Sequence, residues 1–289
     1  MDNNLCQKMP VPSVCDMTPL VSVIVTTRNE ERNIEACLSS VTAQTISREN
    51  IEIIVVDNDS RDSTKEISAR FTGAVFNAGP ERSAQRNFGA RRAQGKYLLF
   101  LDADMILSER VVEECVETCR RQGYAALYIP EQIIGRGFWI RVRNFERSFY
   151  DGTVIDCVRF MRKDAFLSIG GFDETLTGPE DWDFDRRMKP YGKVGISVEP
   201  LFHNEDAFRV GKYYQKKSYY SLSFEKYIDK WGRGDETIKK QFGFYYRFIG
   251  VYCEQGKVFR LLRHPVLALG MYFLRFLVGI SYLKNKVHG

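Results

Sequence analysis

Histidine and paired cysteines are scarce in this 289-residue chain. Only three histidines occur, His203, His264 and His288, and the seven cysteines show no paired spacing. Cys115 and Cys119 lie four residues apart on one face of a predicted helix, with no histidine near them in the sequence. This pattern favours buried thiols over a zinc site, and it fits a reducing, intracellular compartment rather than a disulfide-stabilised secreted protein.

Several common signatures are also missing. The polar first residues lack the apolar core of a secretion signal, and no internal repeat or low-complexity tract occurs. No P-loop pattern is present, and no G-x-G-x-x-G follows the first predicted strand, which argues against ordinary nucleoside triphosphatases and dinucleotide enzymes. Residues 1–19 contain three prolines and are predicted to form a polar tail.

The chain does contain short apolar, β-branched runs that alternate with helical patterns. We predict strands at 20–27, 51–56, 74–76, 97–101 and 125–129, with helices beginning near residues 34, 63, 83 and 108. This alternation predicts an α/β fold, a mainly parallel sheet with helices on both faces. Ligands of such sheets lie beyond the carboxyl ends of the strands, which is where Thr27, Asp57 and Asp102 fall.

Two aspartates interrupt the most apolar of these runs. The segment Tyr97–Leu101 leads directly into Asp102-Ala103-Asp104, although aspartate is depleted in strands and costly to bury unpaired. One interpretation is a loop start or a helix cap. The other is a cation site, because hard divalent ions take carboxylate and phosphate oxygens together.

A second acidic cluster, Glu180-Asp181-Trp182-Asp183, follows the turn-forming pair Gly178-Pro179. Acids favour the first turn of a helix, so the cluster can be a charged helix start. It can also supply a general base, and the two interpretations are compatible. The flat face of Trp182 suits stacking against a sugar or a lipid.

Four segments together resemble the inverting glycosyltransferases of family 2, which have the GT-A fold. In order, they are VSVIVTTRNEERNI, IEIIVVDNDSRDST, ERSAQRNFGARRAQGKYLLFLDAD and GGFDETLTGPEDWDFDRRM. The resemblance covers residues 20–205 and implies a GT-A catalytic domain there, with a nucleotide-sugar donor and a Mn²⁺ or Mg²⁺ cofactor.

The resemblance also implies a role for each matched residue. Contacts to the nucleotide sugar would come from Thr27, Glu30, Asp57, Asn58, Arg86 and Asp102; metal ligands would be Asp104 and His203; acceptor contacts would be Glu180 and Trp182. Asp181 would be the general base. The family often has aspartate where this chain has Asn58, but an amide can still pair with a pyrimidine edge, so we expect a UDP-sugar.

Composition changes after residue 205. Residues 206–289 hold 16 Lys and Arg against 6 Asp and Glu, and 19 of the 38 aromatic residues. Residues 265–283 are nearly all apolar, with Arg275 near the middle, and a central arginine costs about 2.5 kcal/mol or more to insert into a bilayer. We therefore expect residues 206–289 to be helical and to lie on the cytoplasmic face of a membrane with snorkelling bases. The side chains expected to meet anionic headgroups are Arg247, Lys257, Arg260 and Arg263.

The alternatives for this segment are a membrane span at residues 265–283, a packed helical cap or a homodimer interface. For the whole chain, the sequence predicts a metal-dependent inverting glycosyltransferase acting on a saccharide or lipid-linked acceptor in cell-surface glycan assembly. A polyprenyl-phosphate glycosyltransferase, a catalytically inactive scaffold, and a protein that only binds nucleic acid or membrane are the other hypotheses. The acid-rich first 205 residues and the long apolar run argue against a nucleic-acid partner.

Overall fold

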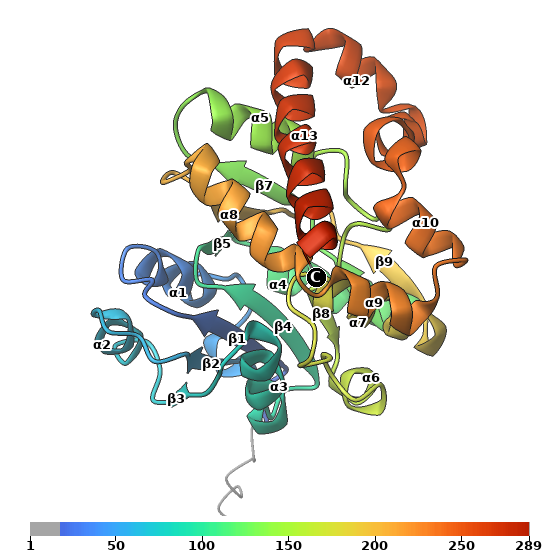
Figure 1. The fold of residues 1–289 in the computed structure, drawn as a ribbon. Helices are drawn as coiled ribbons and strands as arrows, with labels where there is room; N and C mark the ends of the chain where they lie inside the picture. Colours follow the sequence, from blue (N-terminus) through green and yellow to red (C-terminus); the bar gives the residue numbers. More distant parts are fainter. Residues whose placement is uncertain (1–17, 289) are drawn as a thin grey trace, which may run out of the picture.

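The computed structural model describes residues 18–288; residues 1–17, which make up most of the predicted tail, and Gly289 lie outside the described part. Its main feature is a seven-stranded sheet (Figure 1). The strand order is β3 (Val75–Asn77), β2 (Ile51–Asp57), β1 (Val21–Thr27), β4 (Tyr97–Asp102), β8 (Phe160–Arg162), β6 (Ala126–Tyr128) and β9 (Val194–Ile196). Strand β8 is antiparallel to both neighbours, and the other pairs are parallel.

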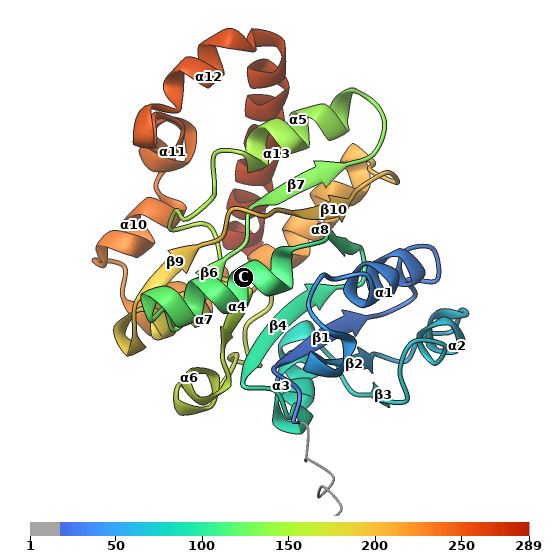
Figure 2. The same ribbon diagram turned by 180° about the vertical axis from the view of Figure 1, so that it is seen from behind.

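Helices cover both faces of this sheet because its strands are buried on both sides. Val21, Val23 and Val25 share one core with α1 (Ile34–Thr42) and α4 (Val111–Gln122), while Ile24 packs toward α3 (Arg82–Arg92), α6 (Lys163–Ser168) and α7 (Glu180–Met188). Figures 1 and 2 show the two helical layers from opposite sides. The short α2 (Thr64–Ser68) joins β2 to β3. Cys115 and Cys119 are buried free thiols on α4, as predicted.

A second, three-stranded sheet was not predicted from the sequence. It consists of β5 (Met105–Leu107), β10 (Leu201–Asn204) and β7 (Glu131–Ile134), with β10 in the centre. The register places His203 opposite Met105, the residue that follows Asp104. The small sheet therefore brings together side chains that are about a hundred positions apart in the sequence.

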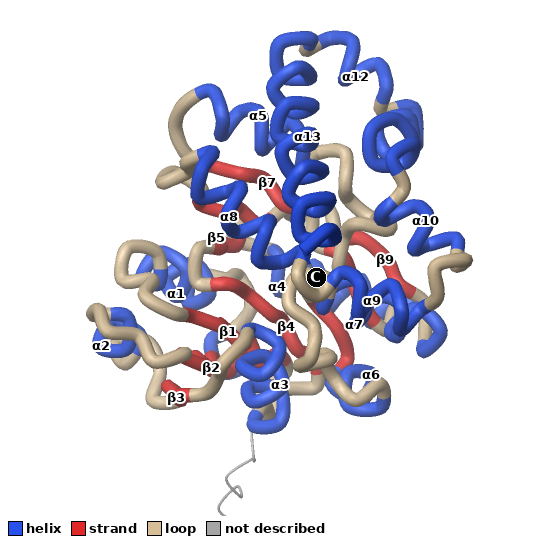
Figure 3. Tube along the Cα trace, viewed as in Figure 1, coloured by secondary structure: helices blue, strands red, loops and turns tan. Residues whose placement is uncertain are grey.

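The part of the chain after Asn204 is helical through residue 288 (Figure 3). Its main helices are α8 (Val210–Ser221), α9 (Phe224–Trp231), α10 (Glu236–Phe242), α12 (Val258–Arg263) and α13 (Pro265–His288), with a π-helical turn, η3 (Tyr246–Gly250), and the short α11 (Val251–Cys253) between α10 and α12. Helix α13 packs against α5 (Phe138–Arg147) and α8 (Figure 1). Gly270 permits this close approach, because a Cβ there would lie 2.7 Å from Val142 Cγ2.

The central Arg275 and two of the four bases expected at a membrane surface make contacts within the protein. Arg275 is buried, with its Nε 3.4 Å from Glu146, and it also donates to the Tyr252 hydroxyl. Lys257 Nζ donates to the Phe149 carbonyl at 3.0 Å. Arg247 lines a cavity. Helix α13 thus presents its central arginine to the protein core, and the contact of the other bases with lipid headgroups stays a prediction.

Candidate active site

The polar residues predicted at strand ends lie together at the carboxyl ends of neighbouring strands. Thr27 pairs in register with Asp57, and Thr26 with Asp102, so three neighbouring strands end at the same level. The Thr26 hydroxyl donates to Asp102 Oδ1 at 3.1 Å. Asp104 lies in the turn between β4 and β5, ahead of α4, whose N-cap is Arg110. The aspartate pair is therefore not a helix cap.

A cavity of about 170 Å³ opens at this edge; we call it the strand-end cavity. Four of the predicted site residues line it: Thr27, Glu30, Asp102 and Asp104. Among the described residues, Thr27 Oγ1 and Asp104 Oδ1 are buried and have no hydrogen-bond partner. Since buried polar atoms are normally satisfied, these two are available to a ligand.

Asp57 and Asn58 do not line this cavity. Asp57 is fully buried, and both its oxygens accept from Ser60, one of them from the backbone N–H at 2.8 Å. The side-chain amide of Asn58 donates to the Pro80 carbonyl at 2.5 Å. Both residues lie at the end of β2, and β1 separates β2 from β4, the strand that carries Asp102. Their contact with a nucleotide base stays a prediction.

Arg86 joins the two acidic motifs. Its buried guanidinium donates from Nη1 to Asp181 at 2.6 Å and from Nη2 to Asp102 at 3.0 Å. Arg82, one turn earlier on α3, contacts Glu180 at 3.0 Å and Asp102 at 3.4 Å. Burial alone would raise the pKa of Asp102, but the charges of Arg86 and Arg82 outweigh it and hold that pKa well below its usual range.

The first turn of α7 carries the second acidic motif, as the sequence predicted. Gly178 precedes it with a φ of 104°, a conformation that favours glycine. Glu180 is buried, and its pKa is raised by burial and by the neighbouring charge of Asp181, against the opposing effect of Arg82. Asp181 faces a cavity of about 250 Å³, the central cavity, and Arg86 holds only its Oδ1.

The Trp182 ring is partly covered by the protein, so it is not open to a stacking ligand on both of its faces. Its indole N–H donates to the Ile155 carbonyl at 3.2 Å, and one side packs against Phe224 and Phe242. The ring also lines the central cavity. It therefore forms part of the wall between this polar cavity and an aromatic cluster behind it.

His203 and Asp104, the two predicted metal ligands, are in direct contact. Its Nε2 lies 3.0 Å from Asp104 Oδ2 and its Nδ1 lies 2.9 Å from Glu131 Oε1. Burial lowers the pKa of His203, but hydrogen bonds and charge from Asp104 and Glu131 raise it to about 10. Arg159 and Arg147 in turn contact Glu131, at 3.2 and 3.5 Å.

The donor set fits a divalent ion shared with a ligand. Within residues 18–288 no group of three or more His, Cys, Asp or Glu side chains is arranged to hold a metal by itself. The unpartnered Asp104 Oδ1 would supply one oxygen, and His203 Nε2 would supply a nitrogen after giving up its proton and its contact with Asp104 Oδ2. Mg²⁺ and Mn²⁺ sites at phosphates commonly have few protein ligands, since phosphate and water oxygens complete them.

Sequence reasoning missed a group of side chains that line the central cavity. They are Arg143 of α5, Lys216, Lys217 and Tyr220 of α8, and Arg247 of η3. Tyr220 and Lys216 also line the strand-end cavity. The signal was present in the basic, aromatic run of α8, but the composition of that run was attributed to a membrane surface.

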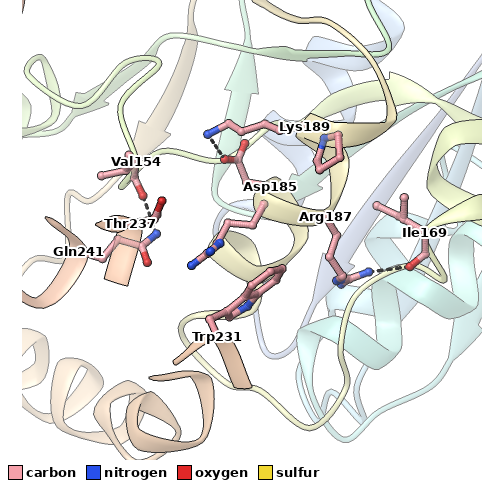
Figure 4. A pocket seen from close by; sticks show the side chains of 10 residues that line it. Val154, Ile169, Asp185, Arg187, Lys189, Trp231, Thr237 and Gln241 are labelled. Atoms are coloured by element: carbon pink, nitrogen blue, oxygen red, sulfur yellow. Dashed lines mark hydrogen bonds and ion pairs between the residues drawn. The ribbon is translucent and has the colours of Figure 1, made fainter. Parts of the chain in front are cut away.

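A shallow cavity of about 560 Å³ lies elsewhere, against α7 and α10 (Figure 4). None of the predicted site residues lines it. Lys189 Nζ pairs with Asp185 at 2.7 Å and Arg187 donates to the Ile169 carbonyl at 2.7 Å, contacts that the figure draws. Its charged side chains are thus already paired, and we do not count it as part of the site.

Comparison with known proteins identifies the family of the chain. Residues 22–172 match the model of the family described as glycosyl transferase family 2. Among curated relatives, glycosyltransferase AglE of Haloferax volcanii is 39% identical over 112 residues, which cover 36% of this chain and 37% of AglE. The minor teichoic acid biosynthesis protein GgaB of Bacillus subtilis is 27% identical over 202 residues, covering 63% of this chain and 22% of GgaB. The chain thus matches well under half of either relative's length.

Among solved structures, the mannosyltransferase PcManGT of Pyrobaculum calidifontis, in complex with GDP-Man and Mn²⁺, superposes with a TM-score of 0.60. It is 18% identical, and the match covers 96% of this chain and 91% of PcManGT. This likeness confirms the predicted GT-A fold with its C-terminal helices. The family match includes the strand ends at Thr27, Asp57 and Asp102, and it stops before Glu180. The chain belongs to glycosyl transferase family 2.

Proposed function

We propose that this protein transfers a sugar, with inversion, from a nucleotide diphosphate sugar to a saccharide or lipid-linked acceptor in cell-surface glycan assembly. The observation that carries the proposal is the double contact of Arg86 with Asp102 and Asp181. It holds a donor-side carboxylate and a candidate base in one fixed arrangement, although one lies at the end of β4 and the other on α7. The similarity to AglE, a glycosyltransferase, and to GgaB, a teichoic acid biosynthesis protein, supports this class of reaction.

The strand-end cavity is the proposed donor site. Asp104 and His203 would hold Mn²⁺ or Mg²⁺, and the bound ion supplies Lewis-acid stabilisation of the leaving diphosphate. Arg28, Arg82 and Lys216 line the same cavity and add positive charge. The unpartnered Thr27 hydroxyl can donate to the nucleotide, and Asp102 is placed to accept from a ribose hydroxyl.

Asp181 is the proposed general base. An inverting transfer needs one group that takes the acceptor proton as its oxygen attacks the face opposite the diphosphate. Asp181 lines the central cavity, whereas Asp104 lines the strand-end cavity, so base and leaving-group site are separate. Arg86 anchors Oδ1 and leaves Oδ2 without a partner among the described residues. The carboxylate is therefore oriented by one oxygen and can accept a proton on the other.

The outer face of α13 is the proposed membrane contact, at the cytoplasmic leaflet. Its exposed apolar side chains recur every three or four residues: Val266, Leu269, Phe273, Phe276, Ile280 and Leu283. By length and composition the helix is long and apolar enough to cross a membrane, with a mean hydropathy of 1.8 in an 18-residue window within Pro265–Lys284. Because Arg275 on the opposite face is fixed to Glu146 inside the protein, we propose that α13 lies on the surface rather than spans it.

Nucleotide binding tests the donor site directly. Calorimetry with UDP and GDP in parallel, with and without Mn²⁺, should show metal-dependent binding of one nucleotide; we expect UDP. Asp104→Ala should abolish the metal-dependent part, while Asp229→Ala, an exposed aspartate on α9, should leave it unchanged. If neither nucleotide binds the folded protein with Mn²⁺ present, the proposed function is wrong.

A further inference from the structure

A third cavity, the aromatic cavity, adjoins the central cavity on the side away from the strand ends. It measures about 330 Å³, and its walls come from α5, α7, α8, α9, α10, η3 and α13. Figure 1 shows α8, α10 and α13 surrounding this part of the molecule. Trp182, Lys217, Tyr220 and Arg247 line both cavities, so the two spaces are separated only by shared side chains.

Positive charge in the aromatic cavity exceeds negative charge. Its lining includes four cations, Arg143, Lys217, Arg247 and Arg275, but only one carboxylate, Glu146. Arg143 contacts Glu146 at 2.7 Å and is also paired with Glu205 nearby. Arg275 lies 3.4 Å from the same Glu146, and its buried Nη2 has no partner among the described residues. One acid is thus shared between two arginines.

Lys217 and Arg247 have no acidic partner. In the described part of the chain, no carboxylate oxygen lies within 4.0 Å of either side chain. Their neighbours include aromatic rings: the ring centre of Tyr213 is 5.5 Å from Lys217 Nζ, and that of Trp182 is 5.9 Å from the Arg247 guanidinium. Burial, with the charges of Arg143 and Lys216, lowers the pKa of Lys217 to about 7. Both side chains are half-buried and line the cavity. A bound anion would supply the opposite charge that both lack and would favour the protonated form of Lys217, so their placement points to an anionic ligand.

The remaining walls are apolar. Nine aromatic side chains line the cavity: Tyr150, Trp182, Tyr213, Tyr220, Phe224, Phe242, Phe244, Phe248 and Tyr282. Of the lining residues, Phe244 and Leu283 are also 72% and 61% exposed on the outside of the molecule. Leu283 ends the exposed apolar row of α13, so the cavity opens beside the surface proposed to meet the membrane.

We propose that the aromatic cavity binds the phosphate or diphosphate of an amphiphilic acceptor. The anion lies between Lys217 and Arg247, and the apolar chain runs along the rings toward the outer face of α13. This inference rests on the proposed transferase function and assigns the acceptor to a lipid phosphate ester. A cavity that is cationic at one end and aromatic at the other matches such a molecule in both parts.

The position of Asp181 supports an acceptor rather than a donor in this cavity. The strand-end and aromatic cavities share only Tyr220, whereas the central cavity shares side chains with both. Asp181 lines the central cavity and neither of the other two. The proposed base therefore lies between a metal-dependent diphosphate site and a metal-free anion site, which is the order that a transfer between two substrates requires.

The test uses dodecyl phosphate below its micellar concentration as the probe, with calorimetry on the full chain. Dodecyl maltoside is the neutral amphiphile of the same chain length, and inorganic phosphate is the anion without a chain. The variants are Lys217→Met and Arg247→Met, and Lys212→Met, an exposed lysine on the same helix, is the matched control. Binding of UDP with Mn²⁺ is measured on every protein.

Dodecyl phosphate should bind more tightly than either comparison ligand. Each cavity variant should weaken it by about tenfold or more, the value of a charge-assisted contact, and Lys212→Met should not. Thermal unfolding midpoints should not fall in the cavity variants, because an unpaired cation is removed. UDP binding should persist throughout, since Lys217 and Arg247 do not line the strand-end cavity.

Equal binding of dodecyl phosphate to wild type and both cavity variants would overturn the proposal. So would equal affinity for the phosphate and maltoside amphiphiles, or for inorganic phosphate and dodecyl phosphate. If wild type binds dodecyl phosphate through Lys217 and Arg247 but binds no nucleotide, the anion site stands and the transferase function fails. The two conclusions are thus tested separately.

Discussion

Replacing Arg86 with methionine should destabilise the protein most strongly near neutral pH. Arg86 is 1% exposed and neutralises two carboxylates, Asp102 at 3.0 Å and Asp181 at 2.6 Å. Methionine keeps the apolar stem but removes the charge. Breaking one side of a buried ion pair costs roughly 3–5 kcal/mol, and we expect the lower end because Arg82 remains 3.4 Å from Asp102.

The pH dependence follows from the pKa of Asp102. In the wild type this pKa is depressed, so the carboxylate's contribution to stability is fully present above about pH 3.9, the pKa of an unfolded aspartate, and is lost as the pH falls through the folded value. Without Arg86, the largest of the charges that oppose burial is lost, although Arg82, Arg159 and His203 remain, and the folded pKa of Asp102 moves up. The loss of stability should therefore be largest near pH 7 and smaller near pH 4.5, where part of Asp102 can be protonated.

Urea unfolding followed by circular dichroism at pH 7 and pH 4.5 measures both differences. Arg91→Met is the matched control, because Arg91 is an exposed arginine on the same helix, and we expect it to change stability by less than about 0.5 kcal/mol. Adding Asp181→Asn to Arg86→Met should recover part of the loss, since one uncompensated charge disappears. An equal loss at both pH values, or no loss at pH 7, would refute this account of Arg86.

Two further outcomes test the proposed chemistry and location. Asp181→Asn should lower the rate of nucleotide release from the donor by about 10²–10⁴-fold with UDP affinity unchanged, and an unaltered rate would contradict its role as base. Replacing Leu269 and Phe276 on α13 with lysine should reduce cosedimentation with phosphatidylglycerol vesicles by roughly thirtyfold or more, because about 1–2 kcal/mol of apolar burial is lost at each position. The exposed Leu167→Lys is the control, and unchanged cosedimentation of the α13 variant would count against membrane contact.

The strand-end acids could be predicted because the information is local. A buried run that stops at a polar residue marks a strand end, and parallel strands bring such ends to one edge. Thr27, Asp57 and Asp102 accordingly lie at matching levels on neighbouring strands. The same reasoning could not tell which of them face a cavity, because Asp57 turns inward to Ser60 through a contact within its own loop.

Contacts between distant segments were beyond this reasoning. The bond from Arg86 to Asp181 spans 95 positions, and the contact of His203 with Asp104 spans 99. The latter depends on the pairing of β10 with β5, two strands of four and three residues. Such short strands have too few residues to show a period, so neither the small sheet nor the side chains it aligns can be deduced from pattern alone.

The C-terminal segment shows why composition alone was misleading. Composition averages over a helix, whereas α13 divides its residues between an apolar outer face and an inner face that carries Arg275. The basic and aromatic residues of α8 and η3 likewise turn inward and line the cavities beside Asp181. The same segment can therefore contact a bilayer on one side and an anionic substrate on the other. If the acceptor is a lipid phosphate, both faces recognise parts of one molecule, and membrane contact becomes part of substrate binding rather than a separate property.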